Sequence, residues 1–460
     1  MDPGGPVSTA DRTAALAARL DTALPAVLAR LDELVAIPSV SADPAHRGDV
    51  LRSARATAEA FSDLGVEVSV VSVDGGQPAV LGRSAPVAGP TVLLYAHHDV
   101  QPTGDVSAWT SPPFEPTRRG ERLFGRGAAD DKAGIVVHLA ALAVLGPELG
   151  CNVRLLIEGE EEIASPTLPK LLVEHRDALA ADVVVVADSV NWAVGTPSLT
   201  TSLRGILDLE VTVSVLDHDL HSGAWGGAVP DAAGVLVRAL ASLYDADGAV
   251  AVPGLHAPER TPAVEYDEQV LRADAGVLPG AGLPGRGPLT ARLWRQPSIT
   301  VIGTSLPPVD DAAHALRARA TARLSVRVPP GVDLTAAAAA LTAHLSANAP
   351  HGALVETTVR ASGHPVDLGD DAPAHAVMTG ALRDAWGSEP VDIGVGGSIP
   401  LIHLLAESLP EATVLVTAVE DPDTRAHGID ESLHLGELTR ACLAEVLLLD
   451  RLADGLPPAP

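Results

Sequence analysis

The chain has 460 residues, 47% of them hydrophobic, and a formal net charge of -28 at pH 7. This length exceeds what a single hydrophobic core usually serves, so we expect a globular protein with two domains. The negative charge argues against nucleic acid and anionic membranes as partners, because both bind clusters of Lys and Arg.

The amino-terminal segment, MDPGGPVSTADR, has acidic and small residues where a signal peptide has basic and then apolar ones. No apolar run reaches the length needed to cross a bilayer, and we therefore expect a cytoplasmic protein. Residues 12–36 carry apolar side chains at helical spacing, which Pro25 interrupts. This pattern predicts two helical stretches.

Short runs rich in Val, Leu and Ile predict buried strands in the following part of the chain. These runs lack clean polar alternation, as strands covered on both faces do. Helical patterns such as residues 132–145 lie between several of them, which favours an α/β fold with a mostly parallel sheet covered by helices. The runs are residues 66–73, 91–96, 153–158, 182–187 and 412–418.

The pattern changes at about Arg204 to alternating strands, ILDLEVTVSVLD and later TARLSVRVPPG, with helical segments between them. This pattern predicts a separate α+β unit. The α/β pattern resumes near Gly363, so the second unit is inserted into the first. We therefore predict one domain formed by residues 1–202 and 363–460, and an inserted domain at residues 203–362.

Histidine and carboxylate side chains follow four of the predicted strands. In open parallel sheets, ligands bind beyond the carboxyl ends of the strands. One acidic turn alone would be read as a solvated loop, but four such strand ends together predict a functional site. The segments are HHDV at 97–100, GEEE at 159–162, DSVN at 188–191 and DTRAHGID at 423–430.

The crowded glutamates of GEEE predict a metal, because a divalent cation offsets the repulsion between carboxylates and imidazoles complete a mixed N/O ligand set. In HHDV, Asp99 suits the orientation of a ligating His97. Successive strand residues point to opposite faces, so we expect His98 to be a packed or surface histidine rather than a ligand of the same metal. Cys151 and Cys442 show no CxxC pattern, which favours buried free thiols over a disulfide or zinc knuckle.

The segments YAHHDVQP, GRGAADDKAG, EGEEEIAS, VADS and RAHGIDE occur in this order over nearly the whole chain. Together they resemble the dinuclear metallohydrolases that comprise carboxypeptidase G, aminoacylase, succinyl-diaminopimelate desuccinylase and the carnosinase-type dipeptidases. DVQP, EGEEEIAS and GGSIP at 396–400 are most similar to the dipeptidase branch. The resemblance implies a zinc-peptidase-like catalytic domain, with the inserted domain acting as lid and dimerisation domain of a homodimer.

The resemblance also implies a site with two divalent metal ions, zinc by preference and manganese or cobalt as alternatives. One ion is expected at His97 and Asp188, a second at Glu162 and His427, with Asp130 bridging both. The peptide bond after Asp130 is expected to be cis. Lys132 is expected to pair with the acidic cluster rather than to act in catalysis.

The resemblance assigns catalytic roles to three further residues. Asp99 would support His97, and Glu161 would be the general base for a metal-activated water. His221, in DLHSGAWGG, would reach the active site of the partner subunit and stabilise the oxyanion. Of the two remaining glutamates, Glu158 is expected to be a strand residue and Glu160 a solvated residue.

Substrate recognition would come from the inserted domain and the GGSIP segment. Arg327 would bind the substrate carboxylate through its guanidinium, with Gly397 and Ser398 as additional donors. His314 stands where dipeptidases of the family often carry Thr or Asn, and it is included as a substrate-binding candidate. Arg204 fits either the site or a salt bridge at the hinge between the domains.

These observations favour a metallodipeptidase that cleaves small peptides. The nearest alternative is an amidohydrolase of the same family that acts on N-acyl amino acids, or a carboxypeptidase, and a requirement for a free amino terminus separates them. A catalytically inactive binding protein would have lost a ligand or the base, and none is lost. A nucleotide-binding protein would need a glycine-rich loop such as GxGxxG directly after a strand, and no predicted strand is followed by one.

Overall fold

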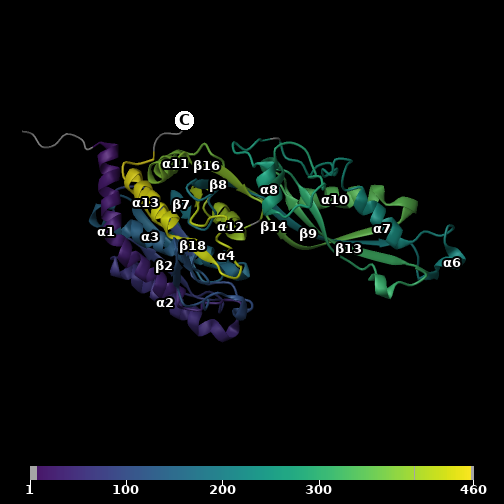
Figure 1. The fold of residues 1–460 in the computed structure, drawn as a ribbon, viewed down its shortest axis with the longest axis horizontal. Coiled ribbons are helices and arrows are strands. Elements are labelled where there is room, and N and C mark those ends of the chain that lie inside the picture. Colours follow the sequence, from purple (N-terminus) through teal and green to yellow (C-terminus); the bar gives the residue numbers. More distant parts are fainter. Residues whose placement is uncertain (1–7, 259, 398, 457–460) are drawn as a thin grey trace, which may run out of the picture. The chain divides into compact units, whose positions relative to one another are not determined.

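The computed structural model describes residues 8–258, 260–397 and 399–456 (Figure 1). The chain forms two compact units. The first comprises the residues up to Thr201, residues 368–392 and the residues from Leu401 on, whereas the second comprises residues 202–367 and 393–400. Assignment of the first unit as the catalytic domain and the second as the lid and dimerisation domain stays a proposal.

The first unit is built on the sheet with the strand order β1-β2-β6-β3-β7-β17-β8-β15, in which β16 also pairs with β8. The last two strands are β15 Val366–Asp367 and β16 Val391–Val395. Its centre is parallel, because β3 pairs in parallel with both β6 and β7, and β7 pairs in parallel with β17. The antiparallel strands β1 and β2 form one edge. The bounds are β1 Glu67–Val71, β2 Ala79–Arg83, β3 Thr91–His97, β6 Asn152–Glu158, β7 Val183–Val186, β8 Ser198–Leu203 and β17 Thr413–Thr417.

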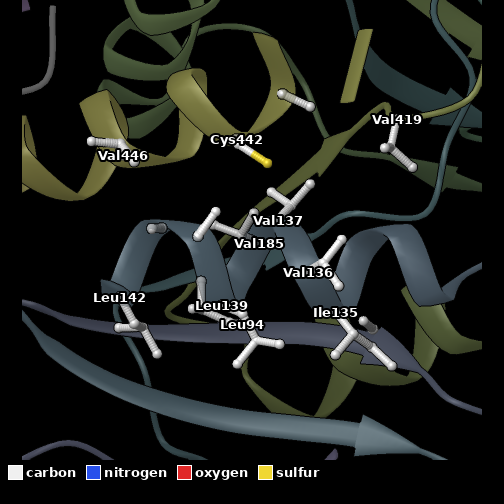
Figure 2. Close-up of a cluster of buried hydrophobic side chains, with 14 of the residues drawn as sticks. Leu94, Ile135, Val136, Val137, Leu139, Leu142, Val185, Val419, Cys442 and Val446 are labelled. Atoms are coloured by element: carbon white, nitrogen blue, oxygen red, sulfur yellow. The ribbon is translucent and has the colours of Figure 1, made fainter. Parts of the chain in front are cut away.

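Helices cover this sheet, and α3 lies deepest among them. The predicted helix at residues 132–145 is confirmed as α3, which begins where the Asp131 carboxylate accepts a hydrogen bond from the backbone N–H of Gly134. It packs on β3 from one side and on α1 and α13 from the other. Figure 2 shows its side chains between Leu94 and Cys442. The helices are α1 Thr9–Val35, α2 Arg47–Asp63, α3 Lys132–Leu145, α4 Leu168–Glu174, α5 Arg176–Leu179, α11 Pro373–Trp386, α12 Pro400–Ser408 and α13 Leu435–Leu452.

Two expectations about this unit were wrong. Pro25 does not break the first helix, because Leu20, Val27 and Leu31 pack into the core on its opposite face. Pro25 and Asp21 are both exposed, so water can hydrate the Asp21 carbonyl that loses its backbone partner. The strand near residues 66–73 is not covered on both faces, since β1 is an edge strand with mostly exposed side chains.

The second unit has an antiparallel sheet with the order β11-β13-β9-β14 and its own hydrophobic core. Side chains of β9 alternate between buried and partly exposed, and helices α7 and α10 pack on the buried face. This agrees with the predicted α+β fold. The bounds are β9 Gly205–Ser214, β11 Ser298–Thr304, β13 Arg319–Val328, β14 Leu354–Gly363, α7 Ala232–Ala241 and α10 Leu334–Asn348, with the shorter elements β10 Leu220–His221, α6 Ser222–Trp225, α8 Glu268–Asp274, α9 Leu289–Trp294 and β12 Ala315–Leu316.

A small sheet of the first unit, with the order β18-β5-β4, joins the carboxyl-terminal part of the chain to the segment before α3. Its strands are β4 Thr117–Arg119, β5 Arg122–Phe124 and β18 Ser432–His434. Cys151 and Cys442 are buried free thiols, as expected. Within the described part of the chain, none of the helices combines the length and apolarity of a membrane span.

Candidate metal centre

The first group of candidate ligands forms where two adjacent strands end. His97 is the last residue of β3, and Asp188 follows β7 by two residues, so both lie at the carboxyl edge of the parallel sheet. Asp130 comes from the segment before α3. The Nε2 atom of His97 lies 3.0 Å from Oδ1 of Asp130 and 3.9 Å from Oδ2 of Asp188.

The second group shares Asp130 with the first. Oδ2 of Asp130 lies 2.9 Å from Nε2 of His427, which in turn lies 3.2 Å from Oε2 of Glu162. Glu162 sits in the short 3-10 helix Glu161–Ile163 that follows β6. His427 adopts a left-handed backbone conformation, with φ of 61°, in the loop between β17 and β18.

The donor set fits two divalent metal ions. Within each group, one donor atom from each residue lies within 4.8 Å of the others. Protein ligands bind zinc at about 2.0–2.2 Å, so donors at these separations can surround one ion. Two imidazole nitrogens and three carboxylates suit zinc, manganese or cobalt. The shared Asp130 makes the two groups one dinuclear arrangement.

Negative charge dominates this site. Burial is the main cause that raises the pKa of Asp188 to about 7, and the Asp130 and Glu162 carboxylates add to the effect, whereas His97 opposes it. Hydrogen bonds that His427 donates to the Asp130 and Glu162 carboxylates raise the pKa of its imidazole to about 11. Carboxylates therefore crowd here at a cost that a bound cation would offset.

Glu161 lies beside this cluster and has the properties of a general base. The pKa of Glu161 is raised to about 8, mainly by burial and also by the neighbouring carboxylates, whose effect outweighs the lowering by His97. A carboxyl group that titrates near neutral pH can both accept and return a proton. The role of Glu161 as general base stays a proposal.

Asp99 connects the Glu161 segment to His97. Its two carboxylate oxygens accept hydrogen bonds from the backbone N–H groups of Glu161 and Glu162, at 3.3 and 3.2 Å. Nδ1 of His97 lies 3.1 Å from the backbone carbonyl oxygen of Asp99 and 3.4 Å from one of its carboxylate oxygens. These contacts suit Asp99 for orienting both a candidate ligand and the loop that carries the candidate base, which is a wider role than the one proposed from the sequence.

Sequence reasoning missed Gln101, which directly follows the HHDV segment. Its backbone N–H and its side-chain amide both donate hydrogen bonds to the Glu162 carboxylate, at 2.9 and 2.8 Å. The expectation for Glu160 was wrong, because this residue is buried rather than solvated. Its carboxylate accepts hydrogen bonds from the backbone N–H groups of Gln77 and Thr167, at 2.7 and 3.1 Å, and so ties down the glutamate loop. Glu158 is the buried last residue of β6, as expected.

Three neighbouring features complete the comparison with the sequence. His98 is buried, with Nε2 at 2.8 Å from the Pro78 carbonyl, and its predicted packing role is confirmed. Lys132 does not pair with the acidic cluster, because its Nζ donates to the carbonyls of Leu34 and Ile37, both at 2.8 Å, at and just beyond the end of helix α1. The peptide bond between Asp130 and Asp131 is cis, as the resemblance implies.

The other candidate residues belong to the second unit, and their site roles stay predictions. His221 ends β10 and is exposed, with its Nδ1 accepting a hydrogen bond from Gly223 at 3.1 Å. Arg327 lies in β13. The Arg204 guanidinium donates to backbone carbonyls, including those of Gly396 and Gln296, at 3.2 Å each. His314 and Gly397 also lie in this unit, whereas Ser398 lies outside the described residues.

Two histidine–carboxylate groups that share one aspartate, at the carboxyl edge of a parallel sheet, define a dinuclear metallohydrolase site. The chain belongs to the peptidase family M20/M25/M40, whose family model matches residues 93–451. It is 34% identical to the cysteinylglycine-S-conjugate dipeptidase of Corynebacterium striatum over 432 residues, which cover 92% of this chain and 94% of that one. It is 27% identical to the human Beta-Ala-His dipeptidase, over 85% and 83% of the two chains.

Solved structures show the same fold. The dipeptidase Dug1p from Saccharomyces cerevisiae superposes with a TM-score of 0.74 at 23% identity, over 97% of this chain and 99% of that one. Human carnosine dipeptidase 1 superposes with the same TM-score, 0.74, at 23% identity, over 98% and 100% of the two chains. The predicted fold class, a mostly parallel sheet with helices and a separate α+β unit, is therefore confirmed.

Proposed function

We propose that this protein is a metal-dependent dipeptidase that hydrolyses the peptide bond of dipeptides. The observation that carries the proposal is the dinuclear ligand set built around Asp130, with Glu161 beside it. The relative from Corynebacterium striatum, with 34% identity, supports the dipeptidase branch. Its name makes S-substituted Cys-Gly the first specific substrate to test, and β-Ala-His the second.

His97 and Asp188 would hold one divalent ion, and Glu162 and His427 the other, with Asp130 shared between them. When bound, these ions supply a polarised substrate carbonyl and an attacking water of lowered pKa. Glu161 would take the proton of that water and return it to the leaving amine. Asp99 keeps Glu161 and His97 in place through the contacts described above. Zinc is favoured, and manganese or cobalt are alternatives.

Recognition of the substrate termini is assigned to the second unit as part of the same proposal. Arg327 would bind the free carboxylate, since a guanidinium offers two parallel donors to it. Gly397 and Ser398 would add donors nearby, and His314 would contact the side chain of the substrate. His221 would stabilise the oxyanion of the neighbouring subunit in a homodimer formed through this unit.

The experiment that tests the proposal measures turnover after chelation and after re-addition of zinc or manganese. Substrates are S-methyl-Cys-Gly, β-Ala-His, alanyl dipeptides, their N-acetylated forms and a tripeptide. Metal-dependent cleavage of the free dipeptides alone is the expected result. Preference for N-acetylated substrates or the tripeptide would instead identify an N-acyl amino acid hydrolase or a carboxypeptidase, and inactivity with every metal would identify an inactive binding protein.

A further inference from the structure

A buried ion pair lies behind the candidate metal centre. Arg126 is 1% exposed and Glu431 is fully buried, and Nη1 of the arginine lies 2.6 Å from Oε2 of the glutamate. Neither residue belongs to the ligand set. Removing two charges from water costs more than their attraction alone usually returns, so stability by itself is a weak explanation for such a pair.

The Glu431 carboxylate is bound to the backbone of the segment that carries Asp130. Its Oε1 accepts hydrogen bonds from the N–H groups of Ala129 and Asp130, at 3.1 and 3.2 Å. Its Oε2 accepts a third from the N–H of Gly127 at 3.0 Å, in addition to the Arg126 contact. The two carboxylate oxygens of Glu431 therefore bind the main chain from Gly127 to Asp130, the aspartate that both ligand groups share.

The Arg126 guanidinium reaches two further segments. Its Nη2 donates to the carbonyl of Gly428, at 3.0 Å, and to the carbonyl of Pro102, at 3.2 Å. Gly428 directly follows His427 in the chain. Pro102 directly follows Gln101, whose backbone and side chain both bind Glu162. One guanidinium thus ties together the segments that present or support all three residues of the second ligand group.

We propose that Arg126 and Glu431 are positioning residues. They would keep Asp130, His427 and Glu162 in the relative positions that binding of the second divalent ion requires. These ligands come from segments far apart in the chain, and the ion needs their donor atoms to converge within a few tenths of an ångström. The charged pair supplies directional hydrogen bonds to the main chain at each segment. The inference rests on the proposed metal centre, because it assigns a task to residues around that centre.

The first test replaces Glu431 by Gln. The amide keeps the size of the side chain, but its NH2 group has to face either Arg126 or the backbone donors, so one set of hydrogen bonds is lost. Loss of an outer support of this kind typically weakens metal binding by about 10- to 100-fold. We expect one of the two zinc ions to bind more weakly by that factor, measured by titrating chelator-treated protein with zinc against a chromophoric chelator.

A second variant keeps the charge of the pair. Arg126→Lys retains attraction to Glu431, but one ammonium group cannot reach Glu431, Gly428 and Pro102 in the fork geometry of the guanidinium. We expect this variant to fold, and to lose zinc affinity by a smaller factor than Glu431→Gln. It therefore keeps the proposal testable if Glu431→Gln does not fold.

The matched control is Glu445→Gln, since Glu445 is also buried and contacts a cationic partner, His138, at 2.8 Å. It should lower the melting temperature and leave zinc affinity unchanged. The proposal is overturned if folded Arg126→Lys and Glu431→Gln bind two zinc ions as the parent does. It is also overturned if Glu445→Gln weakens zinc binding equally. A parent that binds no zinc overturns the proposed metal centre itself, which separates the two failures.

Discussion

Gln101 holds Glu162 by both carboxylate oxygens: its backbone N–H donates to Oε1 at 2.9 Å and its side-chain amide donates to Oε2 at 2.8 Å. The amide also donates to the Glu162 backbone carbonyl at 3.2 Å. A carboxylate with a fixed orientation presents its lone pairs to a metal without further loss of side-chain freedom. Gln101 is therefore expected to determine how well Glu162 can serve as a ligand.

Replacing Gln101 by Ala should weaken the binding of one zinc ion by about 10-fold, because the amide contacts are lost while the backbone donor remains. Zinc titration of the chelator-treated variant measures this change. Gln77→Ala is a suitable control, since the Gln77 amide donates to the Ser41 carbonyl and contacts no ligand. Equal zinc affinity in the Gln101 variant and the parent would show that Glu162 needs no such support.

Replacing Glu161 by Ala separates metal binding from proton transfer. If Glu161 is the general base, turnover should fall by about 10²- to 10⁴-fold while two metal ions remain bound. Turnover and metal content are measured on the same preparation. Glu160→Gln provides the comparison: it disturbs the buried contacts with Gln77 and Thr167, so it should lower thermal stability with much smaller loss of turnover. Loss of metal from the Glu161 variant would contradict this division of roles.

The location of the site could be predicted from the sequence because parallel strands place their carboxyl ends at one edge of a sheet. His97 and Asp188 therefore lie at the same edge of the sheet, because each is at or just after the carboxyl end of one of two adjacent parallel strands. The supporting contacts could not be predicted in this way. Arg126 and Glu431 are 305 residues apart, and their pairing depends on how the small sheet brings β18 to β5. Local patterns contain no information about such a contact.

The errors in the prediction have the same origin. Pro25 weakens a helix locally, but packing of Leu20, Val27 and Leu31 on the opposite face maintains it. A run of three glutamates, residues 160–162, suggests a solvated turn, yet Glu160 is buried because backbone donors from other segments satisfy its carboxylate. In both cases tertiary contacts outweighed the local preference that the sequence displays.

The His138–Glu445 pair should make stability depend on pH in a defined direction. Burial opposes protonation of His138, but the adjacent Glu445 outweighs this and raises the pKa of the imidazole above its ordinary value. A histidine whose pKa is raised by folding stabilises the native state fully below the unfolded pKa of about 6.5. That contribution is lost as the pH rises through the folded pKa.

The measurement compares melting temperatures of the parent and of His138→Gln across the pH range, with chelator present so that metal binding does not contribute. The parent should exceed the variant most at acidic pH, and the difference should shrink as the pH rises. A difference that grows with pH would contradict a charged His138 in the folded protein.

Replacing His221 tests whether this residue takes part in catalysis and, in mixed dimers, whether it serves the partner subunit. If His221 is the oxyanion donor, His221→Ala should lower turnover by about 10²- to 10³-fold with metal content unchanged. The substitution also removes the exposed hydrogen bond from Gly223, so a small change in melting temperature is expected. His218 lies three residues earlier and is also exposed, so His218→Ala is a matched control that should keep parental turnover. Turnover of His221→Ala equal to that of the parent would remove this residue from the site.

Mixing two inactive variants then decides which subunit each histidine serves. In a mixed dimer of Glu161→Ala and His221→Ala, the subunit that keeps Glu161 would receive an intact His221 from its partner, so one site in each mixed dimer should work. If His221 acted within its own subunit, each site would lack either the base or the oxyanion donor, and mixing would restore nothing. Activity that returns after the two proteins are dissociated and reassociated together, but not separately, therefore requires a dimer whose active sites are completed across the subunit interface.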